Sequence, residues 1–214
     1  MHEIAQTLLI HYSSRRPRRI VTVSGHGVRG KFPSRKSANP AQFESLVEEM
    51  ALRFLEAAPL VKSLATQPQV FEYIDGTSQR RYTPDVAIQI ETAEAPVFLE
   101  VKDDRTFTPN SKAAARIRAA LPHLRQCGHR FHIVLRSDLL ANDLQDQLAL
   151  LLRMRPLRGR FRPDTDASLW DPESGTSPPA DVQQQWEDAK RQCDDLLRRI
   201  MNRDPDDLLS VSTR

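Results

Sequence analysis

The sequence predicts an α/β fold in which helices pack against a sheet to form one layered core. Apolar residues recur at three- and four-residue steps over 41–57, which is typical of a helix with one buried face. Short runs rich in β-branched and aromatic residues are typical of strands, and they lie at 69–74, 81–90, 97–101 and 131–135. The resulting order of helix, three strands, helix, strand and helix indicates a layered α/β core, in which the three strands can form a meander.

The N-terminal region, residues 1–39, is expected to be a basic arm. Within it, Ile20–Val23 is predicted to be a strand that leads into a glycine-containing turn. Pro40 suits the start of the first helix, and Pro59 ends it. The pair Asp75-Gly76 is a signal for a hairpin turn between the first two strands of the core.

The second half of the chain alternates helices with one strand and then changes character. An alanine-rich helix with basic side chains is predicted over 110–126, with Gly128 as its C-cap. Asp138 is expected to open a further helix that runs to about Met154, where the core of residues 40–154 ends. A proline-rich linker follows at 155–180, and a polar helix with a short tail occupies 181–214.

Composition excludes several classes of protein. Hydrophobic residues make up 39% of the 214 residues, which is enough for a packed core. No apolar run approaches the ~20 residues that a membrane span needs, and the N-terminus lacks the charge order of a secretory signal, so we expect a cytoplasmic protein with no membrane partner. Cys127 and Cys193 form no CxxC pair, which argues against a structural zinc site or a disulfide framework.

Positive charge is concentrated in one block, although the formal net charge is only +3. Residues 15–36 hold Lys and Arg without any acid, so the block can neutralise DNA phosphates, or it can be a solvated arm. His123, His129 and His132 do not have the spacing of a zinc motif and are interpreted as surface or DNA-facing residues. The residues expected to contact DNA phosphates are Arg15, Arg16, Arg18, Arg19, Arg35, Lys36, Lys112 and Arg116.

The pattern that indicates chemistry is Asp85, after Pro84, followed by Glu100-Val101-Lys102. Alternation along a strand places Glu100 and Lys102 on one face and turns Val101 into the core. If the two strands are antiparallel, Asp85 lies within one strand beside Glu100 on the next. A divalent cation between the two carboxylates would relieve their repulsion, and oxygen ligands suit Mg²⁺ or Mn²⁺. Lys102 could then orient the attacking water or stabilise charge on a phosphate.

A third carboxylate, Glu48, lies on the polar side of the first helix. It can belong to the same site or be an ordinary solvated glutamate, and spacing alone leaves both readings open. The PD and ExK strings can also arise by chance. However, charges at the end of the apolar strand VFLEVK cost free energy unless they are paired or liganded, which favours a functional site.

Taken together, these residues resemble a known superfamily. The order Ser45-x-x-Glu48, Gln67-Pro68, Tyr82-x-Pro84-Asp85 and Glu100-x-Lys102 resembles the restriction-endonuclease-like PD-(D/E)xK nucleases. The stretch GKFPSRK at 30–36 and the tract QPQVFEYIDGTSQRRYTPDVAI narrow the resemblance to TnsA-type endonucleases of heteromeric transposases. The resemblance covers about residues 18–137.

The resemblance implies a fold and a reaction. The core would be a restriction-endonuclease-like mixed sheet flanked by helices. Mg²⁺, or Mn²⁺ in its place, would bind to Asp85, Glu100 and the Val101 carbonyl, with Glu48 completing the acidic set and Lys102 as the catalytic lysine. The reaction would be hydrolysis of double-stranded DNA at the 5′ ends of a transposon. A DDE-type transposase (TnsB) would cut the 3′ ends, and an AAA+ ATPase regulator (TnsC) would be a further partner.

The C-terminal part departs from longer members of this family. A winged-helix domain is not expected there. Two roles for the tail stay open: docking on the transposase or the regulator through Trp186, Leu196 and Leu197, or packing back on the core. Two other functions remain as alternatives: a free-standing restriction or repair nuclease of the same fold, and a catalytically silent module that binds DNA or a partner. Intact Asp85, Glu100 and Lys102 argue against the silent module.

Overall fold

A mixed four-stranded sheet forms the centre of the protein, in the order β3-β6-β7-β8. The computed structural model describes residues 28–91, 93–154 and 179–210. Strand β6 pairs antiparallel with β3 and β7, whereas β7 and β8 are parallel, so the predicted mixed α/β class is confirmed. The strands span Val61–Thr66 (β3), Val86–Ile90 (β6), Val97–Lys102 (β7) and Arg130–Leu135 (β8).

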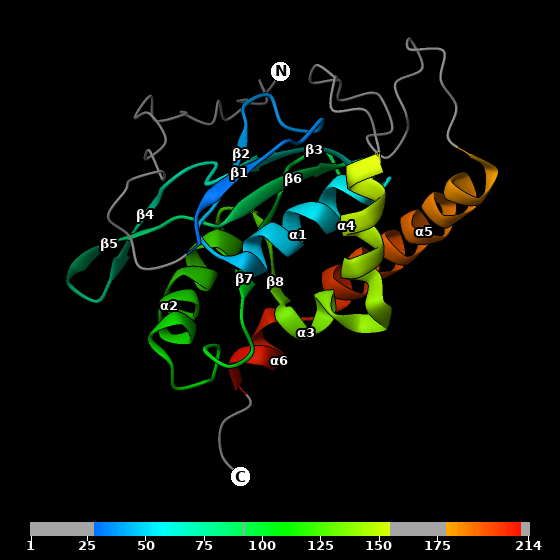
Figure 1. Ribbon diagram of the computed structural model, residues 1–214. Coiled ribbons are helices and arrows are strands. Elements are labelled where there is room, and N and C mark those ends of the chain that lie inside the picture. Colours follow the sequence, from blue (N-terminus) through cyan, green and yellow to red (C-terminus); the bar gives the residue numbers. More distant parts are fainter. Residues whose placement is uncertain (1–27, 92, 155–178, 211–214) are drawn as a thin grey trace, which may run out of the picture.

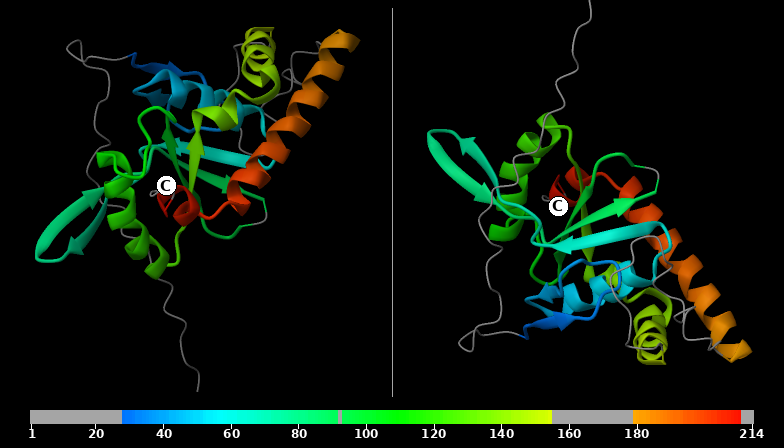
Figure 2. Two further views of the ribbon diagram at one scale, coloured as in Figure 1. Left: turned by 90° about the horizontal axis from the view of Figure 1, so that it is seen from below. Right: turned by 90° about the horizontal axis from the view of Figure 1, so that it is seen from above.

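Helices cover both faces of this sheet (Figures 1 and 2). On one face, alternate residues of β7, beginning with Val97 and ending with Val101, pack with α1, α4 and α5. On the other face, Phe98 packs with α2. Strand β7 is therefore buried on both sides, which explains its almost continuous apolar sequence. These helices span Leu46–Ala57 (α1), Lys112–Gln126 (α2), Leu144–Met154 (α4) and Ala180–Asn202 (α5).

Helix α1 begins at Leu46, later than the expected start after Pro40. Residues Ala41–Phe43 form strand β2 instead, which pairs antiparallel with β1 (Gly30–Phe32). Both Ala41 and Phe43 are buried by the alternation of a strand, which apolar spacing alone does not separate from a helical turn. The Phe43 ring lies against Gly30, where a Cβ atom would come within 2.4 Å of it.

A separate hairpin projects from the sheet beside α2 (Figure 1). Its strands, β4 (Phe71–Asp75) and β5 (Ser78–Tyr82), meet at the predicted turn, where Gly76 has a φ of +61°. The single strand expected over 81–90 is thus divided, because the chain leaves the hairpin at Tyr82 and enters the central sheet only at Val86. Strand β3 was not predicted.

The helix expected from Asp138 to Met154 is also divided. Helix α3 (Arg136–Leu139) and a 3₁₀ turn at Ala141–Asp143 precede α4. Asn142 and Asp143 have φ angles of 57° and 54°, and these left-handed residues interrupt the helix. Gly128, with a φ of +75°, lies directly after the C-cap of α2, in agreement with its predicted role at that helix end.

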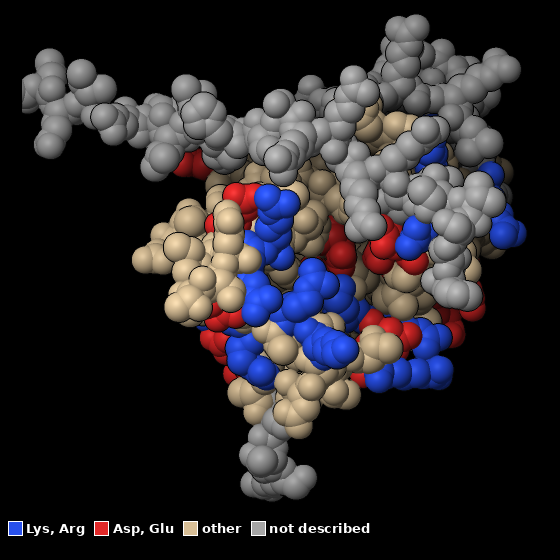
Figure 3. All heavy atoms as spheres, turned by 90° about the vertical axis from the view of Figure 1, so that its left-hand side faces the viewer, with Lys and Arg blue, Asp and Glu red and all other residues tan. Residues whose placement is uncertain are grey.

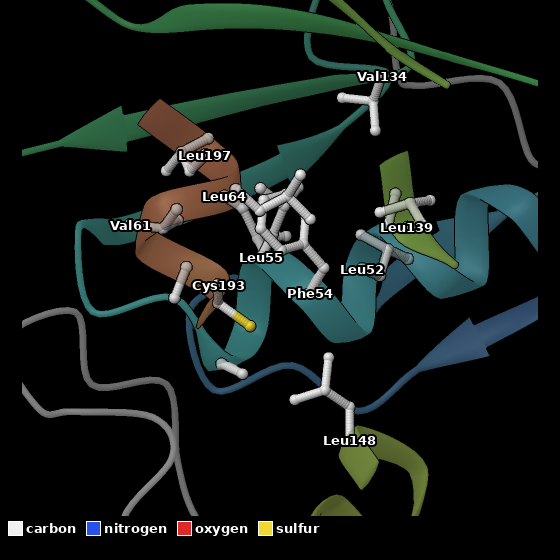
Figure 4. Packing of buried hydrophobic residues seen from close by; sticks show 14 of the residues in the cluster. Leu52, Phe54, Leu55, Val61, Leu64, Val134, Leu139, Leu148, Cys193 and Leu197 are labelled. Atoms are coloured by element: carbon white, nitrogen blue, oxygen red, sulfur yellow. The ribbon is translucent and has the colours of Figure 1, made fainter. Parts of the chain in front are cut away.

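The C-terminal helix is part of the core and not a detached tail. Trp186, Leu196 and Leu197 of α5 are each at most 2% exposed. Figure 4 shows Leu197 and Cys193 among buried residues of α1 and β3. Of the two roles left open for these residues, packing back on the core is therefore the one found, because they fill the space beside α1 and are not exposed to a partner. The chain then ends its described part with α6 (Pro205–Ser210), which packs beside α2 and β8.

Polar contacts fix this C-terminal segment to the sheet. The Arg203 guanidinium donates to the Asp138 carboxylate at 2.6 Å and to the Ile133 carbonyl at 2.8 Å. On α2, Arg125 pairs with Asp204 at 2.6 Å. In the described part of the chain, no helix is both long and apolar enough to cross a membrane.

Candidate active site

The strongest sequence motif comes together at the end of β7, on the sheet face that carries α2. Val86 pairs with Leu99, so Asp85, one residue before β6, comes beside Glu100. Alternation along β7 turns Glu100 and Lys102 to this face and leaves Val101 in the core against α1, as predicted. Asp85 lies in the turn that enters β6 and not within a strand, and its carbonyl accepts a hydrogen bond of 2.8 Å from the Gln67 backbone N–H.

The Lys102 ammonium lies among three of the four oxygen groups that were expected to bind a metal, and Glu48 is not one of these three. Its Nζ is 2.7 Å from Glu100 Oε1, 3.1 Å from Asp85 Oδ2 and 3.0 Å from the Val101 carbonyl. Asp85 Oδ2 also accepts from the Val101 N–H at 2.8 Å. The Lys102 ammonium thus lies at the point where these oxygens converge. The donor set, two carboxylates and one carbonyl, fits Mg²⁺ or Mn²⁺.

Tyr82 holds the other oxygen of Glu100. Its hydroxyl donates to Glu100 Oε2 at 2.5 Å, and the tyrosine is 2% exposed. Its ring packs edge-on against Phe131, with the ring centres 5.9 Å apart. The sequence motif contained Tyr82 without assigning it a role. The sequence did hold one indication of this role. Tyr82 lies three residues before Asp85, and a tyrosine that is buried near a carboxylate site needs a polar partner for its hydroxyl.

The charges of the cluster perturb each other. Burial, and then the negative charge of Asp85, raise the pKa of Glu100 to about 7, although hydrogen bonds from Lys102 and Tyr82 oppose the shift. Burial lowers the pKa of Lys102, but the charges of Glu100 and Asp85 outweigh it and raise that pKa above its ordinary value. Perturbed groups of this kind cluster at functional sites, although ion-pair networks of structural origin perturb pKa values as well.

Glu48 lies near this cluster but is engaged with its own helix. Its Oε2 accepts from the Glu44 N–H at 2.8 Å and its Oε1 from the Ser45 hydroxyl at 3.1 Å, while Ser45 caps the Glu48 N–H. Burial, and then the charge of Asp85, raise the pKa of Glu48. Among the described residues, no three His, Cys, Asp or Glu side chains are arranged to hold a metal ion. The Glu48 carboxylate is thus held at the N-terminus of its own helix, and its part in an acidic set around a metal stays a prediction.

The residues predicted to contact DNA differ in their positions and exposure. Arg15, Arg16, Arg18 and Arg19 lie outside the described residues. Arg35 is half-buried, and its backbone N–H donates to Glu56 Oε1 at 2.9 Å. Lys36 is 2% exposed, and its Nζ donates to the Leu55 and Ala58 carbonyls at 3.0 and 2.5 Å. The prediction for Lys36 is wrong, because this lysine satisfies the last carbonyls of α1 and does not reach the surface.

Lys112 and Arg116 are both exposed on α2. They are four residues apart and so share one side of that helix. The charge of Arg116 acts on Tyr82, which places this arginine close to the site. Figure 3 shows Lys and Arg side chains gathered on the face of the molecule that carries α2 and the hairpin, beside acidic side chains. Both residues are therefore accessible from solvent, and Arg116 lies near Tyr82.

The three histidines have packing roles. The His123 ring lies 4.9 Å from that of Tyr73, and the His129 ring lies 5.1 Å from that of Phe71, measured between ring centres. These contacts attach the root of the β4–β5 hairpin to α2 and its C-terminal end. His132 is buried in β8. The interpretation as surface or DNA-facing residues is wrong for His132, because its strand is covered on both faces.

No model of a known protein family matches the chain, and no curated protein matches it either.

Proposed function

We propose that the protein is a metal-dependent DNA endonuclease of the restriction-endonuclease-like PD-(D/E)xK type. The observation that supports this most is the convergence of Asp85, Glu100 and the Val101 carbonyl on the position of the Lys102 ammonium. The mixed sheet flanked by helices agrees with the fold that the resemblance implies. The exposed Lys112 and Arg116 would hold the DNA backbone beside the site.

The reaction would be hydrolysis of a phosphodiester. A bound Mg²⁺ or Mn²⁺ would act as a Lewis acid on the phosphate and lower the pKa of a bound water. Asp85, Glu100 and the Val101 carbonyl would hold this ion. Lys102 would stabilise negative charge that develops on the phosphate through its ammonium, which lies beside both carboxylates. Glu48 would contribute a third carboxylate at the edge of the site, through a water.

The resemblance to TnsA-type enzymes gives the biological setting of this proposal. The protein would cut the 5′ ends of a transposon, while a DDE transposase (TnsB) cuts the 3′ ends and an AAA+ ATPase (TnsC) regulates both. The buried α5 removes the expected docking helix, so contact with these partners would have to use other surfaces.

Cleavage of end-labelled transposon DNA by the full-length chain tests the proposal, with Mg²⁺ or Mn²⁺ and with the transposase present or absent. We expect Lys102→Met to reduce the rate by at least about a hundredfold, since one preorganised charge contributes about that much. Lys62→Met is the matched control, because Lys62 pairs with Glu91 on the surface at 3.6 Å and should leave the rate unchanged.

The position of the cut separates the proposed setting from its alternative. Cleavage at the 5′ ends that depends on the transposase supports the heteromeric enzyme, and cleavage by the chain alone at other sites supports a free-standing nuclease. If Lys102→Met cuts DNA as fast as the unaltered protein, the assignment of the active site is wrong.

A further inference from the structure

Each of the two site carboxylates has one oxygen held by a donor that cannot move away easily. Glu100 Oε2 accepts from the Tyr82 hydroxyl at 2.5 Å, and Asp85 Oδ2 accepts from the Val101 backbone N–H at 2.8 Å. The Val101 N–H is fixed by the chain itself. Tyr82 is fixed by burial, because it is 2% exposed and packs against Phe131. Glu100 therefore presents Oε1, the oxygen 2.7 Å from Lys102 Nζ, to a cation at this site.

This restriction matters because Mg²⁺ and Ca²⁺ use carboxylates differently. Mg²⁺ requires near-octahedral geometry with short bonds, usually to one oxygen of each carboxylate, and keeps several waters. Ca²⁺ takes six to eight oxygens and often binds both oxygens of one carboxylate. A carboxylate that already accepts a strong hydrogen bond on one oxygen therefore favours Mg²⁺ over Ca²⁺.

We propose that Tyr82 is a specificity-determining residue that selects the metal ion: by holding Glu100 Oε2, it limits Glu100 to one-oxygen ligation and so favours Mg²⁺ and Mn²⁺ over Ca²⁺. This inference rests on the proposed metal-dependent function and adds to it the residue that chooses the ion. In two-oxygen ligation by Glu100, the ion and the Tyr82 hydroxyl would compete for Oε2, and loss of the hydrogen bond would leave a buried hydroxyl without a partner.

The chain offers a matched pair of variants for the test. Tyr82→Phe removes the hydroxyl that holds Glu100. Tyr73→Phe removes the hydroxyl of the other tyrosine on the same face of the hairpin, whose ring packs on His123 and whose position is also buried. Both variants lose one oxygen atom from the same small sheet, so a difference between them reports on the contact with Glu100.

Mn²⁺ binding to the full-length protein without DNA is measured by electron paramagnetic resonance, with Mg²⁺ and Ca²⁺ as competitors. In Tyr82→Phe, we expect the affinity for Ca²⁺ relative to Mg²⁺ to rise about tenfold, which is the usual effect of one hydrogen bond to a charged group. In Tyr73→Phe, the ratio should equal that of the unaltered protein. An unchanged ratio in Tyr82→Phe overturns the role of Tyr82 but leaves the nuclease proposal standing. Failure of the unaltered protein to bind Mn²⁺ overturns both.

A second measurement uses the unaltered protein and does not depend on the folding of a variant. Crystals soaked in Mn²⁺ locate the ion by its anomalous scattering. We expect the ion on Glu100 Oε1, with Oε2 still accepting from Tyr82. Ligation by both oxygens of Glu100 would refute the inference, whatever the variants show.

Discussion

Replacing Glu100 with glutamine is expected to stabilise the fold above pH 7, although the proposed reaction needs this carboxylate. Its pKa is raised from the ordinary 4.5 to about 7 by burial and by Asp85. A pKa that is higher in the folded state means that the protonated form favours folding. The contribution is complete below about pH 4.5 and is lost as the pH rises through 7. At about 1.4 kcal/mol for each pH unit between these values, the loss is about 3 kcal/mol.

Other groups of the cluster do not mask this effect. The pKa of Lys102 is also raised, so its contribution to stability is lost only above its ordinary value of 10.5. The pKa of Glu48 is raised too, but Glu48 is present in both proteins. Glutamine is neutral at every pH and has the shape of the protonated acid. The variant should therefore keep the stability that the unaltered protein loses.

Thermal unfolding of the full-length protein between pH 4.5 and 8.5, with EDTA present, measures the difference. At about 2–4 °C per kcal/mol for a chain of this size, we expect Glu100→Gln to raise Tm by roughly 6–12 °C at pH 8.5 and by little at pH 4.5. Glu49→Gln, which alters a surface pair with Arg53, makes the same charge change and should not produce such a gap. If the two proteins have the same Tm at pH 8.5, or if their Tm values differ equally at every pH, the ionised form of Glu100 does not destabilise the fold.

Three further substitutions test other parts of the structure. Ser45→Ala removes the cap of α1 and frees Glu48, and should lower the free energy of unfolding by about 1 kcal/mol with an unchanged urea m-value. Arg203→Ala removes the charged hydrogen bonds that join the end of α5 to β8 and α3, and should cost about 1.5–3 kcal/mol in urea unfolding; a loss below half of that would make this contact a minor one. Replacing both Lys112 and Arg116 with glutamine should reduce the slope of log affinity for DNA against log salt by about 2, and an unchanged slope would remove α2 from the DNA interface.

The parts of the site that the sequence predicted are those that depend on neighbours along one strand. Glu100, Val101 and Lys102 follow the alternation of β7, so their faces could be read from their order. Asp85 was expected beside Glu100 if the two strands paired antiparallel, and the antiparallel pairing of β6 with β7 meets that condition. The hairpin turn at Asp75-Gly76 was predicted, but the end of its second strand at Tyr82, before β6 begins at Val86, was not. The buried hydroxyl contact with Glu100 arises from how that hairpin meets the sheet, which no local pattern contains.

The predictions that were wrong depend on contacts between distant parts of the chain. Lys36 looks like the other members of a basic block, and only the end of α1, about twenty residues later, makes it a buried donor. The apolar side of α5 was visible at helical spacing. Its partner surface was not, because contacts such as the Asp194 carboxylate on the Leu60 N–H join residues 134 positions apart. Strand β3 has polar residues, Lys62 and Ser63, near its start, and its pairing with β6 defines it more than its composition does.

The charge balance of the site argues against a purely structural ion pair. When both are ionised, Asp85 and Glu100 carry two negative charges and Lys102 carries one positive charge, so the cluster has a net negative charge. Burial raises the pKa of Glu100, and the uncompensated charge of Asp85 adds to that rise. A network selected for stability would be neutral or would be replaced by apolar residues, which are often at least as stable in such a place. A site that is short of one positive charge, with oxygen atoms already converging on a cation, has the electrostatic character that a divalent ion would satisfy without a proton.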